Sequence, residues 1–141
     1  MKSFAVLLIV VLLSSCTPFL LNTQDYKVQS MDLDTAWKLV SSYNYIPEKK
    51  DYWKSPNEFF DDGGGDCEDF AATMMYLLGP ESSMIIIITT TDPHAIVSFH
   101  NIYFEPQTYG KFYNVKNITT LTTYTFFQTM FIATKGGSKN L

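Results

Sequence analysis

The residues with the clearest capacity for chemistry are a cysteine, a histidine and a glutamate that follow one another along the chain. Cys67 lies in the segment GGGDCEDFA, and His94 and Glu105 come after it. Cysteine-dependent hydrolysis needs a thiolate nucleophile, a base that takes the thiol proton and a group that orients the base. Order alone is weak evidence, because a single cysteine on an apolar helical face is commonly a small core residue. The three residues are therefore a candidate catalytic set that other features must support.

The segment that begins near Asp66 predicts the helix that would position the cysteine. Five side chains recur at helical spacing and form one apolar face: Cys67, Phe70, Ala71, Met74 and Leu78. Gly79-Pro80 ends this pattern. Cys67 is thus expected at the helix N-terminus, where unpaired backbone N–H groups and the helix dipole stabilise a thiolate and can later bind an oxyanion.

The chain after this helix has the pattern of β-strands. Because Met84 to Thr91 is almost uniformly apolar and rich in β-branched residues, this strand should be buried on both faces. His100-Asn101 should form the tight turn of a hairpin with His94 on one strand and Glu105 at the end of the next. The other predicted strands are His94 to Phe99, Ile102 to Glu105, Phe112 to Val115 and Leu121 to Phe131, the last overlapping a stretch, Thr119 to Phe127, that also fits a helix.

The chain before Asp66 is predicted to begin with another helix. Leu33 to Tyr45 has helical apolar spacing, Asp32 or Asp34 can cap its start, and Pro47 should end it. Residues 49–62 should form a surface loop or short helical turn over the site, and glycines 63–65 should allow close backbone contacts. Helix, loop, helix and then strands define an α+β fold, with the helix of Cys67 packed on an antiparallel sheet.

The first sixteen residues resemble the signal peptide and lipobox of bacterial lipoproteins. An apolar run from Phe4 to Leu13 follows Lys2 and is too short to span a bilayer as a mature helix. It leads into Leu13-Ser14-Ser15-Cys16. The resemblance implies removal of residues 1–15 and attachment of acyl chains such as palmitate to Cys16, which would anchor the protein in the bacterial cell envelope. Thr17 directly after the cysteine favours the periplasmic face of the outer membrane over the inner membrane.

Four parts of the chain follow from these features. They are the lipoprotein signal peptide (1–15), a lipid-anchored tether (16–30), one folded domain (31–134) and a flexible tail (135–141). With Cys16 lipidated, Cys67 is the only remaining thiol, so it has a partner elsewhere or is a reactive thiol. The net charge of −4 and the lack of a basic stripe exclude a nucleic-acid partner.

Four segments, in this order, resemble the bacterial transglutaminase-like cysteine proteinase family of the papain-like superfamily. They are WKSPNE (53–58), GDCEDFA (65–71), HAIV (94–97) and YFEPQT (103–108). The resemblance covers Tyr52 to Thr108 and implies a small papain-like or transglutaminase-like core with a Cys67–His94–Glu105 triad. The activity implied is that of a peptidase or amidase on envelope proteins or peptidoglycan peptides, with no cofactor required for the chemistry.

The chain departs from the family pattern at the third triad position. Transglutaminase-like folds usually carry an aspartate there, whereas this chain has Glu105. Asn101 is the competitor, because papain uses an amide in that role, although Asn101 is more simply a turn former. His100 is expected to be a turn or surface residue and not a second base.

Three acids and a tryptophan around the motif have two interpretations each. Asp66, Glu68 and Asp69 can cap the helix, with Glu68 and Asp69 pointing away from Cys67. They can also be calcium ligands, because LapG-type proteases that share the motif bind calcium through the equivalent acids. Trp53 is expected to wall the cleft or donate its indole N–H near the oxyanion, or else to pack against the helix that carries Cys67.

Three functions remain open after the resemblance is taken into account. Hydrolysis is favoured, and with an amine in place of water the same site would perform transglutaminase-like acyl transfer. A non-enzymatic envelope binding module of the same fold is the third, and an origin in a phage or mobile element is compatible with the small size of the chain.

Overall fold

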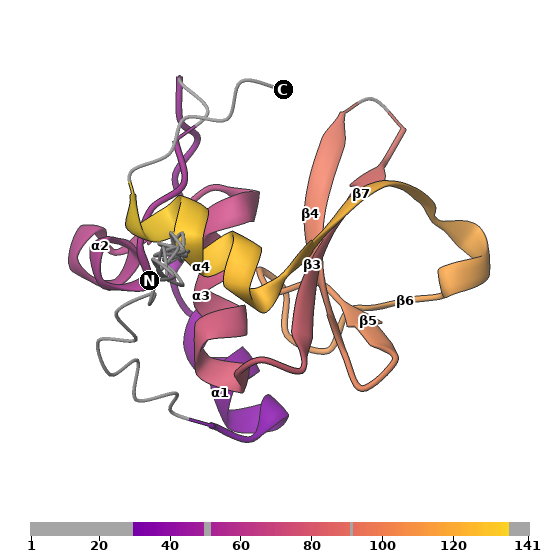
Figure 1. Cartoon of the computed structure of the whole chain (residues 1–141), viewed down its shortest axis with the longest axis horizontal. Coiled ribbons are helices and arrows are strands. Elements are labelled where there is room, and N and C mark those ends of the chain that lie inside the picture. The colour runs from indigo at the N-terminus through magenta and orange to yellow at the C-terminus, as the bar shows by residue number, and fades with distance from the viewer. Residues whose placement is uncertain (1–29, 50–51, 91, 136–141) are drawn as a thin grey trace, which may run out of the picture.

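The fold places helices on one side of an antiparallel sheet (Figure 1). The computed structural model describes residues 30–49, 52–90 and 92–135. The helices are α1 (Leu33–Val40), α2 (Pro56–Asp62), α3 (Cys67–Leu78) and α4 (Phe126–Thr134), with a short 3-10 helix η1 (Val115–Asn117). The main sheet has the order β6-β5-β4-β3-β7, from β3 (Ser82–Ile88), β4 (Pro93–Phe99), β5 (Ile102–Phe104), β6 (Phe112–Tyr113) and β7 (Thr119–Thr125).

These elements confirm the predicted α+β class, with the helix of Cys67 packed on an antiparallel sheet. The predicted signal peptide, the lipidation site at Cys16 and nearly all of the tether and tail lie outside the described residues, so the four-part division of the chain stays a prediction. Within the described ranges, no helix is both long enough and apolar enough to cross a membrane.

Helix α3 is the centre of the core. It contacts the other three helices as well as strands β3 and β4. Phe70, Met74 and Met75 are at most 1% exposed, and burying side chains of this size stabilises the fold by about 1.5–3 kcal/mol each. The predicted apolar face is therefore buried, and so are Ala72, Thr73 and Met75 outside it, whereas Cys67 is half-buried at the N-terminal end.

Strand β3 is buried on both faces, as the sequence predicts. Met84 belongs to the cluster beneath the helices, whereas Ile85 and Ile87 pack with Ile96 in a second cluster on the other face. Ile118, which follows η1, covers part of this second cluster. The strand ends at Ile88, short of the predicted Thr91.

The β4–β5 hairpin carries the two residues predicted to work as base and orienting acid. Its turn is His100-Asn101, with φ values of 49° and 63°, the left-handed pair of a tight hairpin turn. The register pairs Val97 with Phe104. Because the strands are antiparallel, Glu105 is carried back along β4 toward His94, near the start of that strand.

Several other predicted element boundaries are wrong, among them the end of β6, which stops at Tyr113 before η1 begins at Val115. Helix α1 ends at Val40 and not at the predicted Tyr45, and Asn44 and Tyr45 instead form strand β1, which pairs in parallel with β2 (Gly64–Gly65). The stretch predicted as a strand to Phe131 changes to helix α4 after Thr125. A capping box between Thr125 and Gln128 starts that helix.

The segment expected to be a loop or short helical turn contains helix α2. Ser55 and Glu58 form its capping box, and Pro56 occupies its first turn. Phe59 is fully buried and packs against Phe70 of α3. The motif segment WKSPNE is therefore explained largely by the start of this helix.

The β1–β2 ladder depends on a glycine at position 64. A Cβ atom there would lie 1.9 Å from the carbonyl oxygen of Asn44, and its φ is +140°. Gly63, one residue earlier, has a φ of +78°, but a Cβ atom added there would meet no other atom within 4 Å.

Gly64→Ala should therefore destabilise the protein far more than Gly63→Ala. We expect a loss of about 3 kcal/mol or more for Gly64→Ala, because backbone strain and a steric clash combine, and about 1 kcal/mol for Gly63→Ala from strain alone. Denaturant unfolding of both variants measures the difference. Equal losses of unfolding free energy in the two variants would show that the close approach of the β1 and β2 backbones does not add to the cost of a side chain at position 64.

Candidate active site

The N-terminus of α3 positions Cys67. Asp66 is the N-cap residue and forms a reciprocal capping box with Asp69: its side chain accepts from the Asp69 N–H at 3.4 Å, and its own N–H donates to Asp69 at 3.1 Å. Gly65 allows this packing, since a Cβ there would lie 2.3 Å from Asp69 Oδ2. The first backbone N–H groups of a helix have no carbonyl partner within it, so the N–H of Cys67 is suited to an oxyanion.

A buried lysine connects the WKSPNE segment to the same helix. The Lys54 N–H donates to Asp69 Oδ1 at 2.7 Å. The Lys54 side chain, 8% exposed, donates through Nζ to the Gly64 carbonyl at 3.1 Å and forms ion pairs with Asp62 at 3.0 Å and Glu48 at 3.4 Å. Backbone and side chain of one residue thus join α2, β2 and the start of α3.

His94 and Glu105 form a close pair. Nε2 of His94 lies 2.6 Å from Oε2 of Glu105, whose side chain is 3% exposed. Burial alone would raise the pKa of Glu105, but the hydrogen bond and charge of His94, with hydrogen bonds from Tyr113 and Gln107, lower it below its usual range. An ionised carboxylate only accepts hydrogen bonds, so neutral His94 carries its proton on Nε2 and leaves Nδ1 as the basic nitrogen.

Trp37 and Tyr113 hold Glu105, and sequence reasoning missed both roles. The indole Nε1 of Trp37 donates to the Glu105 carbonyl at 2.7 Å, and the Tyr113 hydroxyl donates to Glu105 Oε2 at 2.8 Å. The sequence placed Trp37 only in the apolar face of α1. Its ring does pack there, 4.7 Å from the ring of Phe104, but the indole N–H has a second role that helical spacing does not reveal.

Cys67 lies beside the start of β4, and its thiol is hydrogen bonded to Glu68. Sγ donates to Glu68 Oε2 at 2.9 Å, and the Ala95 N–H donates to the sulfur. Burial, followed by the charge and hydrogen bond of Glu68, raises the pKa of the Cys67 thiol despite the opposing Ala95 contact. Among the described residues, His94 is hydrogen bonded to Glu105 and not to Cys67.

The orientation predicted for Glu68 is wrong. Helix geometry suggested that Glu68 would point away from Cys67, but its flexible side chain reaches back to the thiol. The prediction for Asp69 is correct, because its carboxylate is directed to the backbone N–H groups of Lys54 and Asp66.

The hairpin turn separates Asn101 and His100 from the pair. Both residues are exposed at the end of β4 opposite to His94. His100 pairs with Glu81. Glu105, and not the alternative Asn101, is therefore the partner of His94.

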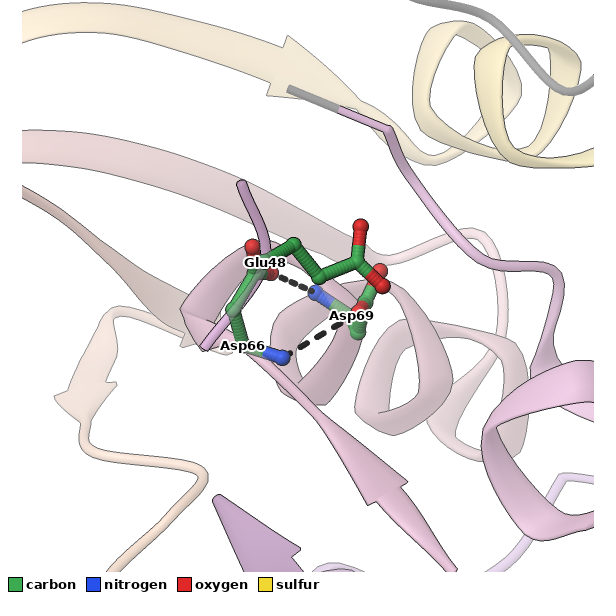
Figure 2. Close-up of side chains that lie close together, drawn as sticks. All are labelled: Glu48, Asp66 and Asp69. Atoms are coloured by element: carbon green, nitrogen blue, oxygen red, sulfur yellow. Dashed lines mark hydrogen bonds between the residues drawn. The ribbon is translucent and has the colours of Figure 1, made fainter. Parts of the chain in front are cut away.

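Three carboxylates form a cluster next to Cys67 (Figure 2). Glu48, Asp66 and Asp69 each offer a ligand atom, and these atoms lie within 4.8 Å of one another. Figure 2 shows the two backbone-to-carboxylate hydrogen bonds that join Asp66 and Asp69. The predicted set included Glu68, which instead binds the thiol, and missed Glu48, which belongs to a separate segment of the chain.

The chemistry of this cluster fits a hard divalent cation. Carboxylate oxygens are the ligands that calcium prefers. Burial and the charges of Asp69 and Glu68 raise the pKa of Asp66 to about 8. Burial raises the pKa of Asp69 to about 6, against the hydrogen bonds from the Lys54 and Asp66 N–H groups. The ionised forms of Asp66 and Asp69 are thus disfavoured even with Lys54 paired to Glu48, and a bound cation would favour them.

Trp53 lies in the core cluster with Phe70 and Ala71 of α3 and is 2% exposed. Its ring contacts Tyr124 of β7 edge-on, with centroids 5.3 Å apart. This packing accounts for the tryptophan at position 53, and its role near an oxyanion stays a prediction.

A cysteine at a helix N-terminus, packed against a strand pair that carries a histidine and an acid, is the arrangement predicted for a small papain-like core. Comparison with solved structures agrees at the level of the fold. The chain is similar to Legionella pneumophila LapG, with a TM-score of 0.55 and 23% identity over 72% of this chain and 66% of that chain. For EGTA-treated Legionella pneumophila LapG, the TM-score is 0.54 and the identity is 23%, over 72% of this chain and 64% of that chain.

The chain thus spans slightly less than two thirds of either LapG chain. No protein-family model matches it, and no curated protein matches it. At this level of identity, the likeness shows the fold, and the chemistry has to be argued from the site.

The carboxylate cluster makes stability depend on pH in a calcium-free, EGTA-containing buffer. Asp66 and Asp69 lose their protons near pH 3.8 in the unfolded chain, but only near pH 8 and pH 6 in the folded protein. Between those values the folded state holds more protons than the unfolded state. The free energy of unfolding should therefore fall as pH rises from 4 to 8. Each of the two carboxyl groups lowers it by up to about 1.4 kcal/mol per pH unit.

Asp66→Asn should flatten this pH dependence and stabilise the protein at pH 8 by about 2 kcal/mol, because asparagine keeps a capping oxygen without the charge. Urea unfolding at several pH values measures it. Asp32→Asn is the matched control: Asp32 caps α1 in the same way but has a lowered pKa, so that variant should gain no stability. Equal behaviour of the two variants would contradict the charge argument.

Proposed function

We propose that the protein is a thiol-dependent hydrolase, a peptidase or amidase with Cys67 as nucleophile, His94 as base and Glu105 as orienting residue. One observation carries the proposal: a histidine paired with a buried carboxylate at 2.6 Å directly precedes Ala95, whose backbone N–H contacts the thiol of a cysteine at a helix N-terminus. If Cys67 and His94 were only packing residues of the core, the fold would need neither an ionised acid beside His94 nor a defined tautomer of its ring. The LapG-like fold supports the same conclusion.

The proposed reaction uses these groups in turn. Nδ1 of His94 takes the thiol proton, and the Cys67 sulfur forms a bond to the carbonyl carbon of an amide. The Cys67 N–H binds the resulting oxyanion. Collapse breaks the carbon–nitrogen bond, and the amine leaves with the proton from His94. Water then hydrolyses the thioester to a carboxylic acid, with Nδ1 again as base, and restores the thiol.

The contact between Cys67 and Glu68 has to break before this reaction can start. It raises the pKa of the thiol, and in this state it favours the second candidate function, a non-enzymatic binding module. We propose that calcium binds at Glu48, Asp66 and Asp69, and that Glu68 can turn from the thiol to join them. Bound calcium would supply positive charge that offsets the local carboxylates.

The proposed substrates are amides of the cell envelope. Lipidation at Cys16 would hold the domain at the periplasmic face of the outer membrane, next to envelope proteins and peptidoglycan peptides. Nucleic acid is not a proposed partner, because the chain is acidic. Transglutaminase-like acyl transfer is the same reaction with an amine in place of the second water, and incorporation of a labelled amine distinguishes it from hydrolysis.

Cys67→Ala should abolish the activity. Comparing the envelope proteins and peptides of cells that express wild type or Cys67→Ala by mass spectrometry should reveal a product of hydrolysis only with wild type. With that substrate, the rate should fall by at least about 1,000-fold in Cys67→Ala and similarly in His94→Gln.

His100→Gln is the matched control for His94→Gln, because it removes the chain's other histidine from an exposed turn. It should keep the wild-type rate. Full biological activity in Cys67→Ala would reject the hydrolase and leave the binding module.

Calcium should stabilise the protein. At a concentration of about 100 times the dissociation constant, calcium adds about 2.7 kcal/mol, which corresponds to a rise of about 10 °C in melting temperature for a domain of this size. Thermal melting in calcium and in EGTA measures the shift, and titration calorimetry measures binding directly.

Glu48→Gln should reduce this shift, because it removes one charged ligand from the cluster. Glu81→Gln removes an exposed carboxylate that pairs with His100 and serves as its control. If the melting temperature is the same in calcium and EGTA, the calcium proposal is rejected, while the hydrolase proposal is tested separately by Cys67→Ala.

A further inference from the structure

One oxygen of Glu105 is the partner in two hydrogen bonds and one ion pair. Oε2 lies 2.6 Å from His94 Nε2, 2.8 Å from the Tyr113 hydroxyl and 3.6 Å from Lys111 Nζ. The other oxygen, Oε1, accepts only from the Gln107 N–H among the described residues, at 3.3 Å. The strongest contacts of the carboxylate therefore converge on the oxygen that faces the histidine.

A glutamate at this position needs such a restraint. Its side chain has one more rotatable bond than that of aspartate, so an unrestrained carboxylate would sample more positions relative to His94. The backbone of Glu105 is held by the Trp37 indole and by its own N–H, which donates to the Lys111 carbonyl at 2.9 Å. These bonds fix the main chain but leave the carboxylate free to rotate.

Tyr113 is placed to restrain the carboxylate itself. It lies on β6, which pairs with β5 so that Tyr113 is opposite Tyr103. Its ring packs against the second core cluster, and the chain between Glu105 and Lys111 is closed by hydrogen bonds from Thr108 N–H to Glu105 and from Lys111 N–H to Thr108. Burial, followed by the hydrogen bond and charge of Glu105, raises the pKa of Tyr113. The phenol thus stays protonated and can donate.

We propose that Tyr113 is a positioning residue of this site: its hydroxyl holds Oε2 of Glu105 where it accepts the Nε2 proton of His94, and so keeps Nδ1 as the basic nitrogen. The inference rests on the proposed function for its catalytic consequence, but the positioning itself concerns only three described side chains.

Lys111 is the competing explanation for the restraint. Its ammonium is 52% exposed and 3.6 Å from Oε2, and it also lies over the Tyr113 ring, 5.2 Å from the centroid. A solvated charge at that distance is screened by water and salt, whereas the hydroxyl makes a short, directional hydrogen bond. Lys111→Gln should therefore disturb His94 less than Tyr113→Phe does.

The tautomer of His94 is the direct readout. The full chain, labelled with ¹⁵N-histidine, contains two histidines, and His100→Gln assigns their signals. At a pH where His94 is neutral, wild type should show the Nε2–H tautomer with slow exchange of that proton. In Tyr113→Phe we expect a mixture with the Nδ1–H tautomer and at least tenfold faster exchange of the Nε2 proton, with the fold retained because only a hydroxyl is removed.

Tyr103→Phe is the matched control, since Tyr103 is paired with Tyr113 across the ladder but its hydroxyl is not among the described donors to Glu105. It should leave the His94 signals as in wild type. An unchanged tautomer and exchange rate in Tyr113→Phe would overturn the proposal, and so would an equal change in Tyr103→Phe or a larger one in Lys111→Gln.

The test of the positioning role of Tyr113 can be distinguished from the test of the proposed hydrolase function. If wild type lacks Cys67-dependent hydrolysis but Tyr113→Phe shifts the tautomer, the positioning role stands and the hydrolase is rejected. If hydrolysis is present, Tyr113→Phe should lower kcat about tenfold with KM unchanged, because the substrate does not touch the hydroxyl; an unchanged kcat with an unchanged tautomer would reject the positioning role alone.

Discussion

The buried carboxylate of Asp69 is the interaction on which the site depends. It is fully buried and accepts hydrogen bonds from the backbone N–H groups of Lys54 and Asp66. One side chain therefore starts α3, places Cys67 in its first turn and attaches the segment before α2. Any larger residue than glycine at position 65 would collide with it. The residues around the cysteine thus form one packed unit.

The same construction opposes activation of the thiol. Capping a helix with acids is favourable, because carboxylates complement the unpaired N–H groups and the positive end of the dipole. Two acids beside Cys67, Asp66 and Glu68, however, add negative charge to a half-buried site, and Glu68 accepts a hydrogen bond from the thiol. Burial of the thiol, followed by the charge and hydrogen bond of Glu68, raises the pKa of Cys67, and the helix dipole does not offset these effects. Compensation of this charge is what links the acidic cluster to the proposed chemistry.

The sheet supplies the other half of the site by a different principle. His94 and Glu105 meet because a tight turn at His100-Asn101 folds β5 back along β4. Glu105 is then bound by one residue that precedes it in the sequence and one that follows it. Trp37 of α1 donates to its backbone carbonyl, and Tyr113 of β6 donates to its carboxylate. An acid that is 2% exposed stays ionised only with such partners. The pair is therefore a property of the whole sheet edge and of the helix packed on it, and not of the hairpin alone.

The amino-acid sequence by itself determined the α+β class, the helix that begins after Asp66, the doubly buried strand β3 and the turn at His100-Asn101. Each depends on local periodicity, capping or turn chemistry, which neighbouring residues carry. The order of Cys67, His94 and Glu105 was also readable, as was the likeness of their segments to a family. Only the tertiary structure decided that Glu48 joins Asp66 and Asp69, that Glu68 turns to the thiol, and that Trp37 and Tyr113 hold Glu105. Each of these contacts depends on a side-chain rotamer or joins residues distant in sequence. The spacing of residues along the chain specifies neither the rotamers nor the long-range contacts.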